Sequence, residues 1–312
     1  MAFALHENAL IALTSAASWG GGDFSGGMGV KASGGRVGGA IRFVILAHAI
    51  SLVVLIGLLW ARGAGMPHGA AVGWSVVAGV MGALGLVAFY IALSRGGMGV
   101  SAAVSGLLAA AIPAVVSSVM EGAPTGLRLT GFGLAGAAIW MIAAGDSPEN
   151  LTPKDGGEAR STMALAIFAG VAFGIYFVAL KMANPLGLMM PMAIARASSV
   201  TLCAVTLGVM GLGRWLRGRP GSENPDPGHP MGGVNRAVVV GWACGVALLD
   251  TGGNLLFMEA TRLGRLDVAS VLASLYPAGT ILLAAWYLHE RPTRRQGLGM
   301  AAALAAVVMI TV

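Results

Sequence analysis

Apolar residues run along the chain in long blocks that short polar connections separate. A helix needs roughly 20 predominantly apolar residues to cross the hydrocarbon core of a bilayer, and ten blocks approach or exceed that length. The blocks are Ala9–Val30, Val37–Trp60, Ala71–Leu93, Val100–Met120, Thr130–Gly145, Thr162–Leu180, Gly187–Leu212, Ala237–Ala260, Val268–Leu288 and Gly297–Val312. The pattern therefore predicts an all-α integral membrane protein with ten transmembrane helices.

The composition supports this prediction, because 56% of the 312 residues are hydrophobic and only 10% are charged, against roughly a quarter charged in soluble domains. The formal charge is +6, but the basic residues stand singly in the connections, so nucleic-acid binding is not expected. Cys203 and Cys244 lie in apolar blocks without CxxC spacing, and no disulfide, metal or cofactor is expected. Trp19 and Asp23 in the first block argue against a cleaved signal peptide.

The two halves of the chain resemble each other. At an offset of 154 residues Arg42 coincides with Arg196, and at an offset of 168 Gly73-Trp74 coincides with Gly241-Trp242. The second offset then persists without a further shift. It pairs Phe89 with Phe257, Gly96 with Gly264, Val100 with Val268, Pro124-Thr125 with Pro292-Thr293, Gly131 with Gly299, and Met141-Ile142 with Met309-Ile310. Paired dipeptides at one offset indicate an internal duplication.

The duplication divides the chain into a first repeat, 1–145, a connecting loop, 146–161, and a second repeat, 162–312, which carries an extra polar loop at 214–236. Each repeat holds five spans, an odd number, so the second must enter the membrane from the opposite side. Two inverted five-helix repeats are typical of transporters, because halves of opposite topology can exchange conformations and open a central site to each side in turn.

The ninth span and the connection after it resemble the second half of an EamA-type transporter of the drug/metabolite transporter superfamily. The residues that carry the resemblance read LASLYPAGTILLA over 272–284 and LHERPT over 288–293. Trp19-Gly20, an arginine that opens the second span of each half, and Glu121 with Gly131 agree with it. The resemblance implies ten helices in two inverted repeats, a central cavity, and export or exchange of small metabolites.

Asp23 and Asp250 stand inside apolar blocks, where an ionisable group costs on the order of 2.5–3.5 kcal/mol, and neither belongs to the family pattern. Asp23 shares a helical face with Trp19, and Asp250 shares one with Asn254. Each carboxylate could bind the amine of a zwitterionic or cationic solute or carry a proton. The alternative is that each pairs with Arg42 or Arg196 for structural reasons. The matching repeat positions of the two arginines favour a structural role for them.

Aromatic residues complete the candidate substrate site. Tyr90, Tyr176 and Tyr276 fall in the third, sixth and ninth spans, which line the cavity in the resembled family, although the first two could instead belong to interfacial belts. Tyr276 precedes Pro277, which frees a carbonyl in mid-span and permits a kink. The predicted substrate-binding residues are Trp19, Asp23, Tyr90, Tyr176, Asp250, Asn254 and Tyr276. Glu121 and Glu290 follow the fourth and ninth spans and are expected to anchor helix ends.

No HExxH, GxSxG or P-loop motif is present, so an enzyme is not expected. The chain is predicted to be a secondary transporter that moves small polar metabolites, such as amino acids, by alternating access; a membrane-embedded enzyme or scaffold is the alternative. The expected partners are the solute, protons as a candidate coupling ion, and the lipid of a bacterial cytoplasmic membrane, with the chain a monomer or homodimer. Orientation stays open, because more basic residues lie opposite the termini, whereas the resemblance implies cytoplasmic termini.

Overall fold

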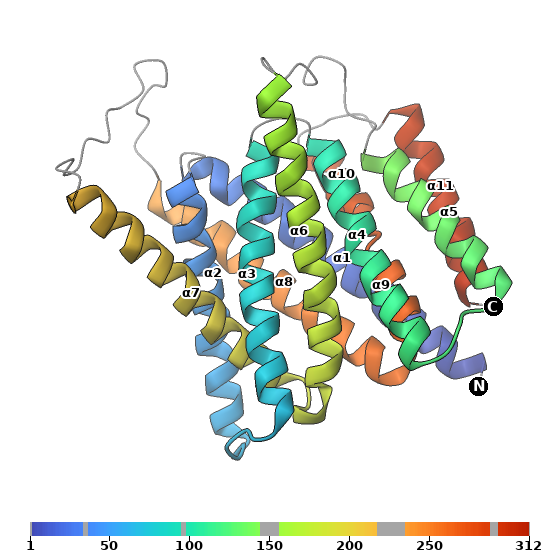
Figure 1. The fold of residues 1–312 in the computed structure, drawn as a ribbon, viewed down its shortest axis with the longest axis horizontal. Helices are drawn as coiled ribbons and strands as arrows, with labels where there is room; N and C mark the ends of the chain where they lie inside the picture. The colour runs from blue at the N-terminus through green and yellow to red at the C-terminus, as the bar shows by residue number, and fades with distance from the viewer. Residues whose placement is uncertain are drawn as a thin grey trace.

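The computed structural model describes residues 2–33, 37–94, 98–143, 156–216, 235–287 and 293–311, and these residues form helices joined by short turns (Figure 1). The helices are α1 (Ala2–Ala32), α2 (Val37–Ala61), α3 (Ala70–Ser94), α4 (Met98–Met120), α5 (Gly126–Ala143), α6 (Gly156–Ala183), the 3-10 turn η2 (Asn184–Leu186), α7 (Met189–Leu216), α8 (Arg236–Leu263), α9 (Leu266–Ala273), α10 (Tyr276–Tyr287) and α11 (Arg294–Thr311). The all-helical prediction is confirmed for the described part of the chain.

Every predicted span coincides with helix, although the ends differ. Five described helical stretches are long and apolar enough to cross a membrane. They are Val37–Ala61, Ala70–Ala92, Arg160–Leu186, Met189–Leu212 and Arg236–Leu263. The loop predicted over 146–161 extends too far, since α6 begins at Gly156 and residues 158–160 are good helix formers. Likewise α7 continues to Leu216 and α8 begins at Arg236, and residues 146–155 and 217–234 of the two loops lie outside the described residues.

The ninth predicted span is broken into α9 and α10 rather than kinked. The amide of Ser274 still donates to the carbonyl of Ser270 at 3.0 Å, but that of Leu275 donates to Leu272 at 3.2 Å, which tightens the last turn. Pro277 then lacks an amide, and its ring excludes the carbonyl four residues back. The sequence located the site of the distortion, and the structure shows that the helix ends there.

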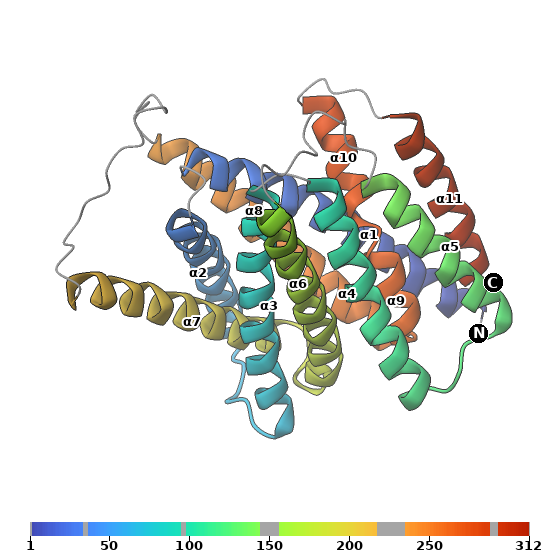
Figure 2. The same cartoon turned by 45° about the horizontal axis from the view of Figure 1, so that its top comes forward.

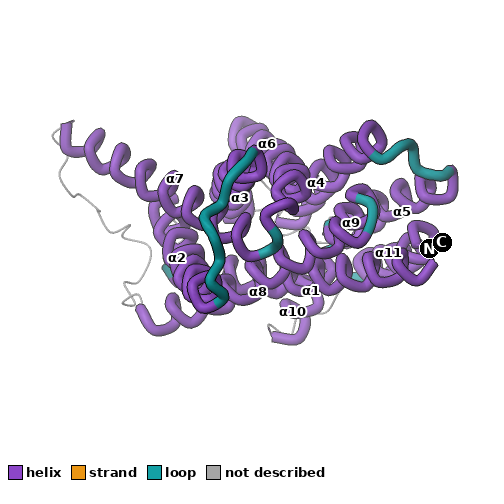
Figure 3. The backbone as a smooth tube through the Cα atoms, turned by 90° about the horizontal axis from the view of Figure 1, so that it is seen from below, coloured by secondary structure: helices purple, strands orange, loops and turns teal. Residues whose placement is uncertain are grey.

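The helices pack in pairs, and each pair corresponds to another pair, or to itself, when the two halves are interchanged. The repeat offsets equate α1 with α6, α2 with α7, α3 with α8, α4 with α9–α10, and α5 with α11. In the structure α1 packs along α8, and correspondingly α6 packs along α3. The pairs α2·α7 and α5·α11 map onto themselves. Figures 2 and 3 show α5 and α11 side by side at one edge of the bundle, with α7 at the opposite edge.

Individual glycine contacts follow the same exchange. A Cβ atom added to Gly131 would lie 2.8 Å from Ile310 Cγ1, and one added to Gly299, its repeat mate, would lie 2.9 Å from Ile142 Cγ1. Ile142 and Ile310 are themselves repeat mates. The α5–α11 contact is therefore reciprocal at the level of single atoms, with each glycine admitting the other helix.

Gly79 marks the tightest approach of α3 to α7. An added Cβ would lie 2.2 Å from the carbonyl oxygen of Ala195 and 2.8 Å from its Cα, and neither backbone atom can move without displacing the helix. We expect Gly79→Ala to lower the free energy of unfolding by about 1–3 kcal/mol, measured by thermal unfolding in detergent. Gly73→Ala, on the same helix with open space around it, is the control and should not destabilise. Equal melting temperatures would contradict the packing argument.

Candidate functional site

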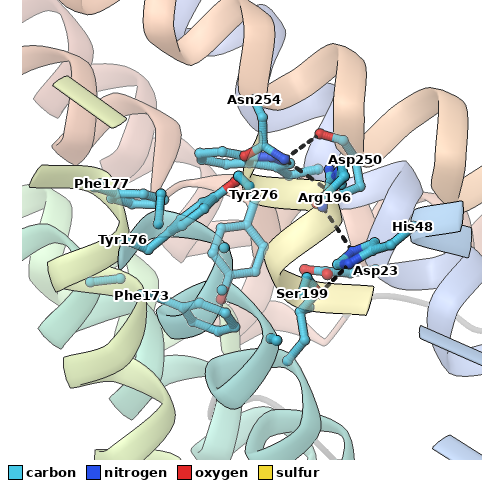
Figure 4. A pocket seen from close by; sticks show the side chains of 18 residues that line it. Asp23, His48, Phe173, Tyr176, Phe177, Arg196, Ser199, Asp250, Asn254 and Tyr276 are labelled. Atoms are coloured by element: carbon cyan, nitrogen blue, oxygen red, sulfur yellow. Dashed lines mark hydrogen bonds and ion pairs between the residues drawn. The ribbon is translucent and has the colours of Figure 1, made fainter. Parts of the chain in front are cut away.

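A cavity of about 60 Å³ lies where α1, α3, α6, α7 and α8 meet, beside the start of α10. It has room for roughly four to six water molecules, at about 10–15 Å³ each. Its polar and aromatic lining residues are Trp19, Asp23, His48, Phe173, Tyr176, Phe177, Arg196, Ser199, Asp250, Asn254 and Tyr276 (Figure 4). Small residues of α3, α4 and α7, including Gly79, Gly82 and Ala109, leave the space open.

The cavity brings together six of the seven predicted site residues, which come from four segments far apart in the sequence. They are Trp19, Asp23, Tyr176, Asp250, Asn254 and Tyr276. Tyr90 is not among the lining residues. It is 4% exposed and packs its hydroxyl against Gly26 of α1, where an added Cβ would lie 2.3 Å away. Tyr90 therefore contacts the helix that carries Asp23, but from outside the cavity.

A chain of polar contacts crosses one wall of the cavity. Arg196 on α7 donates to the Asp250 carboxylate on α8, and also to Thr251 Oγ1 at 3.1 Å. Asn254 Nδ2 donates to Asp250 Oδ2 at 3.2 Å and to the Asp250 carbonyl at 2.7 Å. Asp250 therefore forms the ion pair with an arginine that was the alternative to a solute-binding role, and Arg196 balances its charge. Arg196 is 4% exposed, so this ion pair is largely shielded from solvent.

His48 on α2 extends the chain on the other side of Arg196. Arg196 Nη1 lies 2.8 Å from His48 Nε2, and His48 Nδ1 lies 2.6 Å from Ser199 Oγ (Figure 4). A guanidinium can only donate, so Nε2 must accept and the ring proton must sit on Nδ1, facing Ser199. His48 is therefore neutral in this arrangement, because a proton on Nε2 would displace Arg196. Sequence reasoning missed His48, although a histidine within an apolar block satisfies the criterion that singled out the aspartates.

Arg42, the repeat mate of Arg196, does not share its role. Arg42 is exposed, and no hydrogen bond or ion pair of its side chain occurs among the described residues. The expectation of a shared structural role is wrong for a specific reason. Asp250, the acid that holds Arg196, has Gly82 as its repeat mate, so the first half offers Arg42 no carboxylate at the equivalent place.

Asp23 differs from Asp250 in having no cation beside it. It lines the cavity from α1, and within the described part of the chain its carboxylate has neither a hydrogen bond nor an ion pair. Arg196 and Asp250 cancel each other and His48 is neutral. Of the two carboxyl groups in the lining, Asp250 therefore has a partner cation among the described residues and Asp23 does not.

The cavity has a polar wall and an apolar wall at equivalent positions of the two halves. At the repeat offsets Trp19 corresponds to Phe173, Asp23 to Phe177, Asn254 to Leu86 and Asp250 to Gly82, and all eight residues line the cavity. The α1–α8 pair contributes the polar member each time, and the α3–α6 pair contributes the apolar one. The cavity lining is therefore polar on the side of one helix pair and apolar on the side of the other.

Stacked rings connect the two walls at one end of the cavity. The rings of Trp19 and Phe177 are parallel to within 1°, with centroids 5.0 Å apart, and the Phe177 centroid lies 4.7 Å from that of buried Phe257. Close aromatic pairs stabilise by about 0.5–1.5 kcal/mol beyond the area they bury. The stack positions Trp19 between α6 and α8, one helical turn from Asp23.

In the described part of the chain, long apolar helices surround a polar cavity, an arrangement that indicates an integral membrane protein. Residues 160–312 match the model of the EamA-like transporter family. This segment of the chain belongs to the family, within the drug/metabolite transporter superfamily, whose members are membrane transporters rather than enzymes. The family resemblance seen in the sequence is confirmed.

Two further comparisons were informative to different degrees. No curated protein matches the chain, whereas the solved structures give information on the fold. A solved structure described as "Crystal structure of protein" is similar over 97% of this chain and 95% of its own, with a TM-score of 0.68 and 16% sequence identity. At that identity the likeness shows a shared fold and carries no information about the solute.

Proposed function

We propose that this chain is a secondary transporter that passes a small solute through the cavity by alternating access, and that its ten spans form two inverted five-helix repeats. The observation that carries the proposal is the composition of the cavity, where repeat mates from both halves face each other. The reciprocal contacts of Gly131 and Gly299 support the same symmetry. Halves that pack in equivalent ways can exchange arrangements, and the exchange opens a central site to each side in turn.

The solute that fits this cavity carries a protonated amine and an apolar group, as amino acids and related metabolites do. Asp23 supplies the unbalanced carboxylate, while Phe173 and Phe177 supply the apolar surface opposite it. We assign amine recognition or proton transfer to Asp23 in the first place. Asp250 has the different role of holding Arg196 and Asn254 in position, because its charge is already matched.

The remaining parts of the proposal concern setting and direction. We place the protein in a bacterial cytoplasmic membrane, as a monomer or homodimer, where it exports or exchanges its solute and uses protons as a candidate coupling ion. A membrane-embedded enzyme and a scaffold are the alternatives. An enzyme would alter the solute chemically and a scaffold would not move it, so a flux measurement separates all three.

Reconstituted protein tests the proposal directly. Vesicles loaded with an unlabelled solute are given the labelled form outside, over a panel of cationic, zwitterionic and anionic compounds. We expect exchange of amine-bearing solutes and recovery of the label chemically unchanged, with none in protein-free vesicles. If none of the compounds on the panel is exchanged, transport of amine-bearing solutes is contradicted. Recovery of an altered product would support an enzyme instead.

A further inference from the structure

A second polar cluster closes one end of the bundle, away from the cavity. It consists of Glu121, Lys181, Thr261, Arg265 and Asp267, which we call the lock. The lock lies where α4, α6 and α8 end and α9 begins, at the lower side of Figure 1. It therefore joins α4 of the first half to three helices of the second half.

The core of the lock is a reciprocal cap between the halves. Arg265 Nη1 and Nη2 donate to the carbonyls of Glu121 and Gly122, at 3.0 Å and 2.7 Å, and so satisfy the carboxyl end of α4. In return, Glu121 Oε2 accepts the amide of Leu266 at 3.0 Å, at the amino end of α9. A cation at the carboxyl end of a helix and an anion at an amino end both match the helix dipole. Each half thus completes a helix end of the other.

Two further charges complete the lock. Lys181 Nζ lies 3.2 Å from Glu121 Oε1 and also donates to the carbonyl of Thr261 at the end of α8. Asp267 is fully buried and accepts from Arg265 Nε at 3.0 Å and from Nη2 at 2.8 Å. The lock therefore contains two cations and two anions, held against backbone groups of four helices.

Glu121 stays ionised over the physiological pH range. Burial opposes its ionisation, but the hydroxyl of Ser117, the amide of Leu266 and the ammonium of Lys181 outweigh that effect and lower the pKa of Glu121. Hydrogen bonds to Asp267 raise the pKa of Arg265, which stays protonated. The ionised carboxylate stabilises the folded protein fully at any pH above the ordinary glutamate pKa of about 4.3. This stabilisation is lost only as the pH falls through the lowered pKa of Glu121 in the folded protein.

Three of the lock residues have repeat mates in the first half that carry no charge. At the repeat offsets, Lys181 corresponds to Gly27, Arg265 to Gly97 and Asp267 to Gly99. Glycine has no side chain, so none of these ion pairs can be reproduced at the other end by the symmetry-related residues. The halves share their packing but not this set of charges.

We propose that the lock holds its end of the transporter closed and biases the protein toward the state in which the cavity opens at the opposite end. The inference rests on the proposed alternating-access function. On α6 and α8 the lock lies only one to two helical turns beyond the cavity. The side chains between them, Leu180 and Phe257, are fully buried. Opening this end requires the two halves to separate here, and therefore to break the reciprocal caps and the Lys181–Glu121 pair.

Cysteine labelling in vesicles tests the bias without a solute. In a background with Cys203→Ala and Cys244→Ala, the reporter Ala78→Cys lies in the cavity wall. The marker Met66→Cys, in the exposed α2–α3 connection, identifies the membrane side on which the lock lies. We expect Arg265→Gln to increase labelling of the reporter by an impermeant maleimide from that side by about tenfold or more, since hydrogen bonds of charged groups are lost.

Two more variants keep the test falsifiable. Lys181→Met leaves the reciprocal caps in place and should raise labelling by a smaller factor. Arg262→Gln is the control, because among the described residues Arg262 pairs only with Glu259, at 3.1 Å on α8 at the same end, and it should label like the parent. If the folded Arg265→Gln and Lys181→Met proteins both label at the parent rate, the lock does not set the equilibrium. If Arg265→Gln fails to fold, Lys181→Met decides. Absence of solute exchange would contradict the proposed function while leaving the labelling result unaffected.

Discussion

Replacing Arg196 by methionine should destabilise the protein by about 3–5 kcal/mol, because it leaves the Asp250 carboxylate in a mostly buried place without its cation. Arg196 also donates to Thr251 and His48, and these partners lose a donor at the same time. The free energy of unfolding in detergent, from denaturant titration, measures the effect. The second variant, Arg196→Met with Asp250→Asn, removes both charges and should recover much of the lost stability.

Arg42→Met is the matched control, since Arg42 is the repeat mate of Arg196 but is exposed and forms no ion pair with any described acid. It should change the stability by no more than about 0.5 kcal/mol. A double variant as unstable as Arg196→Met alone would show that the lost hydrogen bonds, rather than the uncompensated charge, cause the damage. Equal effects at Arg42 and Arg196 would contradict the assigned ion pair.

Asp23→Asn should raise the apparent KM for an amine-bearing solute about ten- to a hundredfold, because the substitution keeps the shape of the side chain but removes a charged hydrogen-bond acceptor. If Asp23 instead carries the coupled proton, solute exchange in the variant should lose the pH dependence that the parent shows between about pH 5.5 and 8. Initial rates in reconstituted vesicles, measured over solute concentration and pH, distinguish the two outcomes.

Glu259→Gln is the control for a carboxylate lost elsewhere on the protein. Glu259 forms an ion pair with Arg262 within α8, away from the cavity, and its variant should transport like the parent. Asp23→Asn with parental kinetics at every pH would remove Asp23 from the solute pathway. Selection of the solute would then have to come from the aromatic and backbone groups of the cavity.

The ten apolar blocks, the helices they predict and the sequence match between the halves can all be read from the sequence alone. Long apolar runs leave the backbone no partner in lipid except its own helix, so periodicity and length suffice to place most helices. The offset of 168 residues pairs Gly131 with Gly299 and Ile142 with Ile310, but only the structure shows that each glycine contacts the isoleucine of the other half. The rarity of ionisable residues inside apolar blocks pointed to Asp23 and Asp250.

The difference between these two ionisable residues depends on how the helices pack, which the sequence does not reveal. Asp250 and Arg196 are 54 residues apart, and His48 is 148 residues from Arg196, so no local pattern reveals that they form one network. The lock has the same origin, because Glu121 meets Arg265 and Leu266 across 144 and 145 residues. The sequence shows that a charged residue in an apolar helix needs a partner. Which residue becomes that partner depends on which helices pack together. That packing balances Asp250 and leaves Asp23 free to face the cavity.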